Sequence, residues 1–253
     1  MEKSTNIQDH WIGSYKEESV VGDRRVDVFE KEKVSLVILA RNEAESIGSV
    51  ISSGTEFAGE IVVVDGHSTD GTREIAENLG AKIVLDNREG KGDAIRIAAD
   101  VVENEVVVFI DADGSHFPGE IPSLCRDILK GDADLVIGSR GRGGSDELHG
   151  DIEKLIRMIG SDLILIGINM RFGVFLTDSQ NGFRAIRTSV LKKLPLREKI
   201  TTIEQEMTMK ALKLGYSVSE VSSHEYARYH GSSTIKLSKV WWRYIYSFLK
   251  NLF

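Results

Sequence analysis

The order of apolar and polar residues predicts strands that alternate with helices over the first part of the chain. Short apolar runs rich in β-branched residues are typical of strands buried on both faces of a parallel sheet. Between these runs, apolar residues recur at helical spacing. The pattern predicts an α/β fold with a Rossmann-like, mostly parallel sheet flanked by helices. The expected strands are 34–39, 60–65, 81–85, 106–110 and 133–139, and the expected helices are 44–55, one ending at 79, one beginning near 92, and 118–130.

The second half of the chain is less regular. Residues 151–176 are unusually apolar at helical spacing, but Arg157, Asp162 and Asn169 interrupt them. This region predicts a helix that packs against the sheet, or a groove for an apolar ligand, rather than a membrane span. A further helix is expected from 203 to 214, followed by a strand near 216–221.

The tail, residues 235–253, predicts an amphipathic C-terminal helix. Its apolar face contains two tryptophan or tyrosine residues, and Lys239, Arg243 and Lys250 lie opposite that face. Interfacial membrane helices combine Trp, Tyr and Lys in this way, which predicts peripheral membrane contact. A helix that closes the core, or a dimer contact, is the alternative. The apolar face consists of Leu237, Trp241, Tyr244, Ile245, Phe248 and Leu252.

Composition narrows the functional classes. The chain has 253 residues and a net charge of −7, so it has no basic excess for binding nucleic acid. Its single cysteine, Cys125, excludes a disulfide framework and a cysteine-based zinc site, and suits a reducing compartment. The N-terminus has no apolar signal core, and no apolar run is long enough for a transmembrane helix. We therefore expect a cytoplasmic location, with the tail offering contact to the membrane face.

The candidate chemistry centres on Asp111 and Asp113, which follow the buried strand 106–110. Ligands bind at the carboxyl ends of strands in open α/β sheets, and carboxylates at positions i and i+2 can meet one cation there. Hard oxygen ligands suit Mg²⁺ or Mn²⁺, which would keep other positions for water and substrate phosphates. The alternative is an ordinary polar turn after a strand.

Other charged residues follow strands in the same manner. Glu43, Asp65 and Lys91 lie in loops after strands or open the next helix, so we expect them near Asp111 and Asp113 at one edge of the sheet. Carboxylates, one lysine and a glycine loop suit a nucleotide together with a metal ion; helix capping is the alternative explanation for the acids. The chain has no P-loop motif, and the glycine loop at residues 90–92 is too short for a dinucleotide fingerprint.

Taken in order, these motifs resemble those of inverting nucleotide-sugar glycosyltransferases of the GT-A type (family 2). Within that group the chain is most similar to the dolichyl-phosphate mannose synthase branch, over roughly residues 33–237. The two-aspartate motif is weak alone, whereas the whole ordered set is specific. The matching pieces are Asn42 with Glu43, Asp65 with 68–72, 90–94, 111–113 with 116–118, 133–140, Asp178 with 182–185, Glu206 with Lys210 and Ala211, and Arg228 with Gly231 and Ser233.

The resemblance implies a single catalytic domain at 33–234, after an N-terminal extension at 1–32. Its nucleotide-binding half would be 33–138 and its acceptor half 139–234. Glu43 and Asp65 would hold the base and ribose, with Leu39, Arg41, Lys91 and Asp111 completing the nucleotide site. Asp113 would be the principal metal ligand, beside Asp111. Arg140 and Arg228 would face phosphates, and Asp178, Arg184 and Glu206 would shape the sugar and acceptor site.

Several positions depart from the family pattern. Leu39 and Arg41 stand where a proline and an aromatic residue are common, and Ser115 replaces a glutamine that often binds the metal. His230 stands where a lysine or arginine is usual. Because related phosphoglycerate enzymes place a metal-binding histidine in a comparable loop, His230 is a further metal candidate.

The implied reaction moves a hexose from GDP- or UDP-hexose to a polyprenyl phosphate, with Mg²⁺ or Mn²⁺ offsetting the charge of the leaving diphosphate. A soluble acceptor, such as 3-phosphoglycerate or a growing glycan, is the first alternative. A sugar hydroxyl as acceptor would need a carboxylate base such as Glu204 or Glu206. A non-catalytic nucleotide-sugar-binding module is the second alternative.

Overall fold

The computed structural model describes residues 11, 29–147, 152–230 and 237–252. Most of the expected N-terminal extension, residues 1–32, therefore lies outside the described residues. None of the helices in the described ranges combines the length and the apolar character needed to cross a lipid bilayer.

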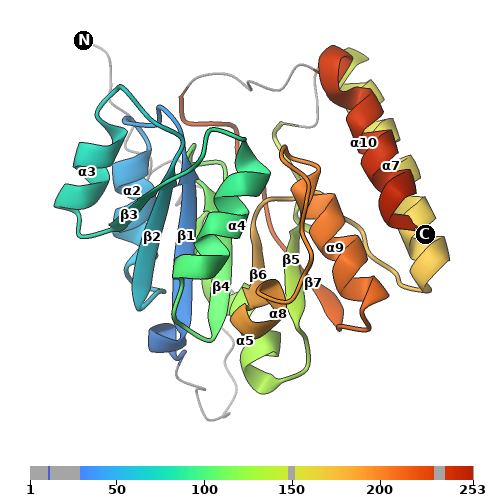
Figure 1. Cartoon of the computed structure of the whole chain (residues 1–253), viewed down its shortest axis with the longest axis horizontal. Coiled ribbons are helices and arrows are strands. Elements are labelled where there is room, and N and C mark those ends of the chain that lie inside the picture. Colours follow the sequence, from blue (N-terminus) through green and yellow to red (C-terminus); the bar gives the residue numbers. More distant parts are fainter. Residues whose placement is uncertain (1–10, 12–28, 148–151, 231–236, 253) are drawn as a thin grey trace.

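A seven-stranded sheet forms the centre of the molecule, in the order β3-β2-β1-β4-β6-β5-β7 (Figure 1). Every neighbouring pair runs parallel except those made by β6, which is antiparallel to both β4 and β5. The expected mostly parallel sheet is confirmed. The strands are β1 (Val34–Ala40), β2 (Glu60–Asp65), β3 (Lys82–Leu85), β4 (Val106–Asp111), β5 (Leu135–Ser139), β6 (Arg184–Arg187) and β7 (Val218–Ser222).

Helices cover both faces of this sheet, because successive strand residues point to opposite sides. In β1, Leu36 and Ile38 join an apolar cluster with α2, α3 and α5, whereas Val37 joins a second cluster with α4, α8 and α9. The arrangement is the expected α/β sandwich around a sheet buried on both faces. These helices are α2 (Ile47–Gly54), α3 (Thr72–Asn78), α4 (Lys91–Val101), α5 (Ile121–Lys130), α8 (Thr188–Leu191) and α9 (Ile203–Lys213).

Two long helices, α7 (Ile152–Phe172) and α10 (Leu237–Leu252), lie beside α9 at one side of the molecule (Figure 1). The expectation that residues 151–176 pack against the sheet is wrong. Ile164 and Ile168 of α7 instead meet Met209 of α9 in a separate apolar cluster, with Tyr244 and Phe248 of α10 at its border. The expected C-terminal helix is present, and α10 uses one face to close this cluster.

The glycine-rich segment at residues 140–145 directly follows β5. It forms a short helix, α6 (Arg140–Gly143), that lies close against the strand end at Ser223. A Cβ at Gly143 would lie 2.2 Å from the carbonyl oxygen of Ser223, so only glycine fits there. The segment is therefore a packed turn that positions Arg140.

Candidate active site

The charged residues predicted from the strand ends do gather at one edge of the sheet. Glu43 follows β1, Asp65 ends β2, and Asp111 ends β4, and these three strands are parallel neighbours. Parallel strands bring their carboxyl ends together, which is why residues distant in sequence meet here. Lys91 begins α4 and reaches the same edge from the side.

Hydrogen bonds join the loop after β1 to the loop after β2. The backbone N–H of Asn42 donates to Ser68 Oγ at 2.8 Å, and its side-chain oxygen accepts from the Thr69 N–H at 2.9 Å. Asn42 has φ of 56°, a left-handed conformation that asparagine tolerates better than most residues. The next N–H, of Glu43, donates to Thr72 Oγ1 at 2.9 Å. This network sets the position of Glu43.

Asp65 is completely buried and holds its own loop in shape. Its carboxylate accepts from the Ser68 N–H at 2.9 Å and lies 3.4 Å from Arg73 Nε. Arg41 packs its side-chain carbons against Gly66, the residue after Asp65. Leu39, one residue from the end of β1, is partly buried beneath this edge. Asp65 thus shapes the wall of the site, while Glu43 and Arg41 lie at its surface.

A partly buried lysine links two carboxylates beside the end of β4. Lys91 Nζ lies 2.8 Å from Asp111 Oδ1 and 2.8 Å from Glu204 Oε1 of α9. Burial alone would lower the pKa of Lys91, but the two carboxylates raise it above its ordinary value. Burial opposes ionisation of Asp111 as well, and Lys91 outweighs this effect and lowers the pKa of Asp111. A Cβ at Gly182 would lie 2.7 Å from Lys91 Nζ, so glycine leaves room for this cluster.

The second aspartate has a cationic partner of its own. Asp113 Oδ2 lies 2.9 Å from Arg228 Nη1, and Asp113 Oδ1 accepts from the Ser115 N–H at 3.0 Å. The Ser115 hydroxyl lies 3.1 Å from His116 Nδ1, inside the protein, and burial lowers the pKa of His116. Asp113 is nearly buried whereas Arg228 remains about one-third exposed, at 6% and 31% of their side chains. Arg228 is therefore the more solvent-exposed member of this ion pair.

Negative charge is concentrated next to these pairs. Burial, followed by the charge of Asp113, raises the pKa of Glu43 to about 7, although Arg228 acts in the opposite direction. Three carboxylates, those of Glu43, Asp111 and Asp113, thus share one small region with Lys91 and Arg228.

Arg140 meets a carboxylate rather than open solvent. Its Nε and Nη2 lie 2.7 and 3.2 Å from the two oxygens of Asp178, and its Nη1 lies 3.4 Å from Glu225. Burial would raise the pKa of Asp178, but Arg140 outweighs it and lowers that pKa. The structure brings the predicted Arg140 and Asp178 together as one bidentate ion pair.

Arg184 and Glu206, predicted to shape the acceptor site, are both completely buried. Arg184 donates to the backbone carbonyls of Asn181 and Glu204, at 2.9 and 2.8 Å. Glu206 accepts the backbone N–H groups of Arg197 and Glu198 at 2.8 Å each, and Lys210 lies 2.6 Å from its other oxygen. Both side chains therefore hold loops that surround the site, and neither reaches its surface. With every oxygen engaged and no exposure, Glu206 is badly placed for the alternative role of a general base.

His230 forms an ion pair with an acid outside the two-aspartate motif. Its side chain is 64% exposed, and its Nδ1 lies 2.9 Å from Glu45 Oε2. The structure thus gives the predicted histidine ligand a different carboxylate partner.

The donor set suits a hard divalent cation that substrate would help to bind. Within the ranges that the structure describes, no group of three or more His, Cys, Asp and Glu side chains is arranged to hold a metal ion by itself. Asp111 and Asp113 offer only oxygen atoms as ligands. Each carboxylate is now paired with a cationic side chain, Asp111 with Lys91 and Asp113 with Arg228. Mg²⁺ commonly takes one or two carboxylates and fills its other positions with water and phosphate oxygens. The residues therefore fit such an ion.

Two neighbours of the site were not predicted from the sequence as members of it: Glu225 and Glu220. Glu220 accepts the backbone N–H groups of Thr177 and Asp178 at 2.8 and 2.7 Å, which fixes the Asp178 loop. These residues lack a strand-end position before a glycine loop, and their partners lie about 40 to 85 positions away in the chain. The only signal in the sequence was the negative charge of these two residues within otherwise ordinary segments.

A mostly parallel α/β sheet with acidic and basic side chains at its carboxyl edge defines a nucleotide-binding class of enzyme fold. Residues 35–195, more than half of the chain, match the family model described as glycosyl transferase family 2. The chain belongs to this family of glycosyltransferases.

Two relatives from Haloferax volcanii are similar to the chain. The glycosyltransferase AglJ is 33% identical over 195 residues, which cover 76% of this chain and 63% of the relative. The low-salt glycan biosynthesis hexosyltransferase Agl6 is 27% identical over 224 residues, which cover 86% of this chain and 53% of the relative. The chain therefore spans less than two thirds of the length of either protein.

A solved structure confirms the fold. Glucosyl-3-phosphoglycerate synthase from Mycobacterium tuberculosis, in complex with Mn²⁺, UDP and glucosyl-3-phosphoglycerate, superposes with a TM-score of 0.68 and 23% identity. The match covers 87% of this chain and 80% of the synthase. The expected GT-A fold is confirmed by this likeness.

Proposed function

We propose that this family 2 glycosyltransferase moves a hexose from GDP- or UDP-hexose to a polyprenyl phosphate. The main support for this proposal is that the two aspartates at and after the end of β4 are each paired with a cationic side chain, Asp111 with Lys91 and Asp113 with Arg228. Such pairs place carboxylates for a divalent cation and cationic groups for phosphates at one point. The similarity to a hexosyltransferase of glycan biosynthesis supports hexose transfer.

The donor nucleotide would bind across the ends of β1 and β2. Arg41 is exposed there and Glu43 is half-buried, and Asp65 and Leu39 support them from beneath. Asp111 and Asp113 would hold Mg²⁺ or Mn²⁺, which when bound stabilises the charge that develops on the leaving diphosphate. Lys91 and Arg228 would then bind phosphate oxygens in place of part of their present carboxylate contacts.

The acceptor phosphate needs little activation. A phosphate monoester is largely ionised at neutral pH, since its second pKa is about 6. Arg228, held at the site edge by Asp113 and about one-third exposed at 31% of its side chain, is placed to orient such a group. Attack from the side opposite the diphosphate would invert the anomeric carbon. No carboxylate base is required, which agrees with the complete burial of Glu206.

The test is a transfer assay with labelled GDP- and UDP-hexoses, Mg²⁺ or Mn²⁺, and polyprenyl phosphate in detergent. We expect label in the organic phase, and a loss of at least about 100-fold for Asp113→Ala, because the variant removes a group that acts on developing charge. The control is Asp100→Ala, which changes an exposed aspartate on α4. Full activity of Asp113→Ala, or transfer that continues with a metal chelator present, would contradict the proposal.

A soluble acceptor is the second candidate, because the synthase of the same fold has been solved with glucosyl-3-phosphoglycerate. The same assay with 3-phosphoglycerate and no lipid separates the two. Label that stays in the aqueous phase as an anionic sugar product would favour this candidate. Binding of nucleotide sugar without any transfer would favour a non-catalytic module.

A further inference from the structure

The helices α7 and α10 carry exposed apolar stripes that no described element covers. Each stripe follows helical spacing, and its side chains are between 46% and 81% exposed. Single exposed apolar residues are common, but two adjacent stripes form the kind of patch that marks an interaction surface. The α7 stripe consists of Ile159, Leu163, Ile166 and Met170, and the α10 stripe of Trp241, Trp242, Ile245, Tyr246 and Leu249.

Both stripes point away from the apolar cluster that joins the helices to α9. In α7, Ile164 and Ile168 are buried in that cluster, and the exposed stripe lies on the opposite side of the helix. In α10, Tyr244 and Phe248 face the cluster and Trp241 and Ile245 do not. A helix that is apolar on both sides belongs in an apolar environment on both sides.

The charge of α10 is opposite to that of the chain. Residues 237–252 contain three basic residues and no acidic one, whereas the whole chain has a net charge of −7. A cationic, aromatic helix on an anionic protein favours an anionic partner. It disfavours a second copy of the same face, because like charges would then meet.

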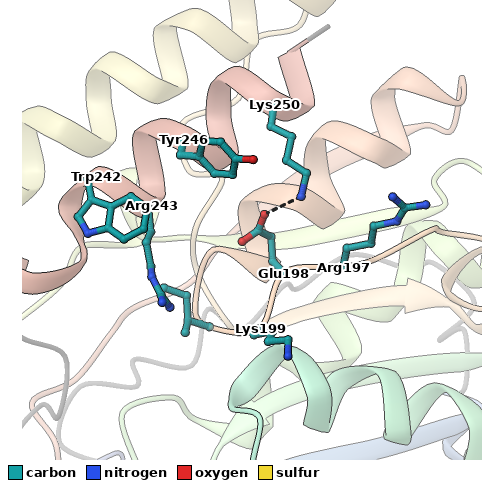
Figure 2. Close-up of a pocket in the computed structure, with 8 residues that line it drawn as sticks. Arg197, Glu198, Lys199, Trp242, Arg243, Tyr246 and Lys250 are labelled. Carbon is teal, nitrogen blue, oxygen red and sulfur yellow. Dashed lines mark ion pairs between the residues drawn. The ribbon is translucent and has the colours of Figure 1, made fainter.

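A pocket of about 250 Å³ lies between α10 and the loop at residues 197–200 (Figure 2). Four basic side chains line it against a single carboxylate, that of Glu198, together with two aromatic rings. Lys250 Nζ lies 3.5 Å from Glu198, so that carboxylate is already engaged. The basic residues are Arg197, Lys199, Arg243 and Lys250, and the rings are those of Trp242 and Tyr246.

The loop that lines the pocket also touches the candidate active site. The carbonyl of Lys199 accepts the N–H of Gly92 at 3.0 Å, one residue from Lys91. A Cβ at Gly92 would lie 2.0 Å from the Glu198 carbonyl oxygen, so the loop and the start of α4 are in direct contact. An anion in the pocket would therefore lie on one side of the loop at residues 197–200, and the Lys91 turn lies on its other side.

We propose that α7 and α10 form a docking surface for an anionic lipid bilayer. The apolar stripes enter the boundary between headgroups and acyl chains, and the basic pocket takes headgroup phosphates. Tryptophan, tyrosine and basic residues are the side chains that interfacial helices use for these two tasks. The inference rests on the proposed function in one respect: it names the face from which a lipid acceptor would reach the site.

The test is co-sedimentation of the full chain with phosphatidylcholine vesicles, with and without phosphatidylglycerol. We expect binding that requires phosphatidylglycerol. Arg243→Gln with Lys250→Gln should weaken it roughly 10- to 30-fold, since each basic residue near an anionic surface contributes about a factor of five. Leu163→Ser with Ile245→Ser should weaken it without any change in charge. Arg126→Gln with Lys193→Gln, which removes the same charge from exposed positions outside the pocket, should bind like the unaltered chain.

Three outcomes would overturn the inference: no vesicle binding, equal binding to pure phosphatidylcholine, or equal weakening by the control pair. Sedimentation velocity that shows a dimer dissociated by the serine pair would assign the surface to a second copy instead. The hexose-transfer assay in detergent is read separately. Transfer without vesicle binding refutes the docking surface alone, and vesicle binding without transfer refutes the proposed function alone.

Discussion

At the residue scale, the site is built from shared partners rather than isolated functional groups. Lys91 is divided between Asp111 and Glu204, and Arg228 is held by Asp113. A divalent cation bound at the two aspartates would take the place of their basic partners. A phosphate bound at Lys91 and Arg228 would take the place of the carboxylates. The basic side chains therefore offset part of the negative charge without ligand, which lowers the cost of keeping so many carboxylates near one sheet edge.

Glu43 provides a test of this electrostatic environment in the protein without ligand. Its pKa is raised to about 7 by burial and by Asp113, so the folded state binds its proton more tightly than the unfolded state does. This stabilising contribution is complete below the pKa of an unfolded glutamate and is lost as the pH rises through about 7. Glu43→Gln lacks the titration. The stability of the unaltered chain relative to this variant should therefore fall as the pH rises.

Urea unfolding at roughly pH 5.5 and pH 8.5 measures this difference, because linkage converts a pKa change into a pH slope of stability. Glu74→Gln, which changes an exposed carboxylate on α3, is the control. If the unaltered chain instead gained stability relative to Glu43→Gln as the pH rises, the sign would be wrong. That result would show that Glu43 is not held in a negative, partly dry environment.

The sequence identified strand-end residues well but not their partners. Asp111 and Asp113 could be found because a buried apolar run stops at them. That Lys91 also meets Glu204 could not be found, because the two are brought together by the packing of α9 on the sheet. For the same reason, Arg184 and Glu206 carried a family motif but no sign of their complete burial.

At the element scale, the long parallel strands were predictable and β6 was not. Four residues, two of them arginine, give β6 no apolar run to recognise. It exists because Ala185 pairs with Val108 of β4 on one side and Val136 of β5 on the other. The helix α7 shows the complementary limit: its apolar pattern predicted burial, but a pattern does not say which surface a helix meets.

Gly167 tests how α7 and α10 pack. A Cβ there would lie 2.4 Å from Phe248 Cζ, so the close approach of the helices needs glycine. Alanine would otherwise favour the helix by about 0.5–1 kcal/mol. Gly167→Ala should nevertheless lower the free energy of unfolding, by about 1–3 kcal/mol, because the added methyl group overpacks the contact.

Gly160 is a matched control in the same helix, since a Cβ there meets nothing within 4 Å. Gly160→Ala should raise the free energy of unfolding by about 0.5–1 kcal/mol, measured by urea unfolding of both variants. Equal gains for the two alanines would mean that α10 does not lie against Gly167.

At the scale of the whole molecule, the chain consists of a sheet with two large apolar clusters and a separate smaller cluster under α7, α9 and α10. The loop at residues 197–202 joins these parts. Tyr244 of α10 lies 2.6 Å from Thr201, and on its other side the loop bonds to Gly92. Elements with few contacts to the main core open at lower free energy than the core itself.

Removal of residues 237–253 should therefore loosen the molecule in a defined pattern. Hydrogen exchange should accelerate at least about tenfold in α7 and at the Gly92 amide, which the loop protects. The reason is that local opening of these segments costs less free energy once α10 is absent. Exchange in β1, β2 and β4 should stay unchanged, since their clusters contain no α10 residue. Acceleration throughout the sheet would show that α10 is part of the main core. Acceleration in α7 without Gly92 would show that the loop holds the Lys91 turn without support from α10.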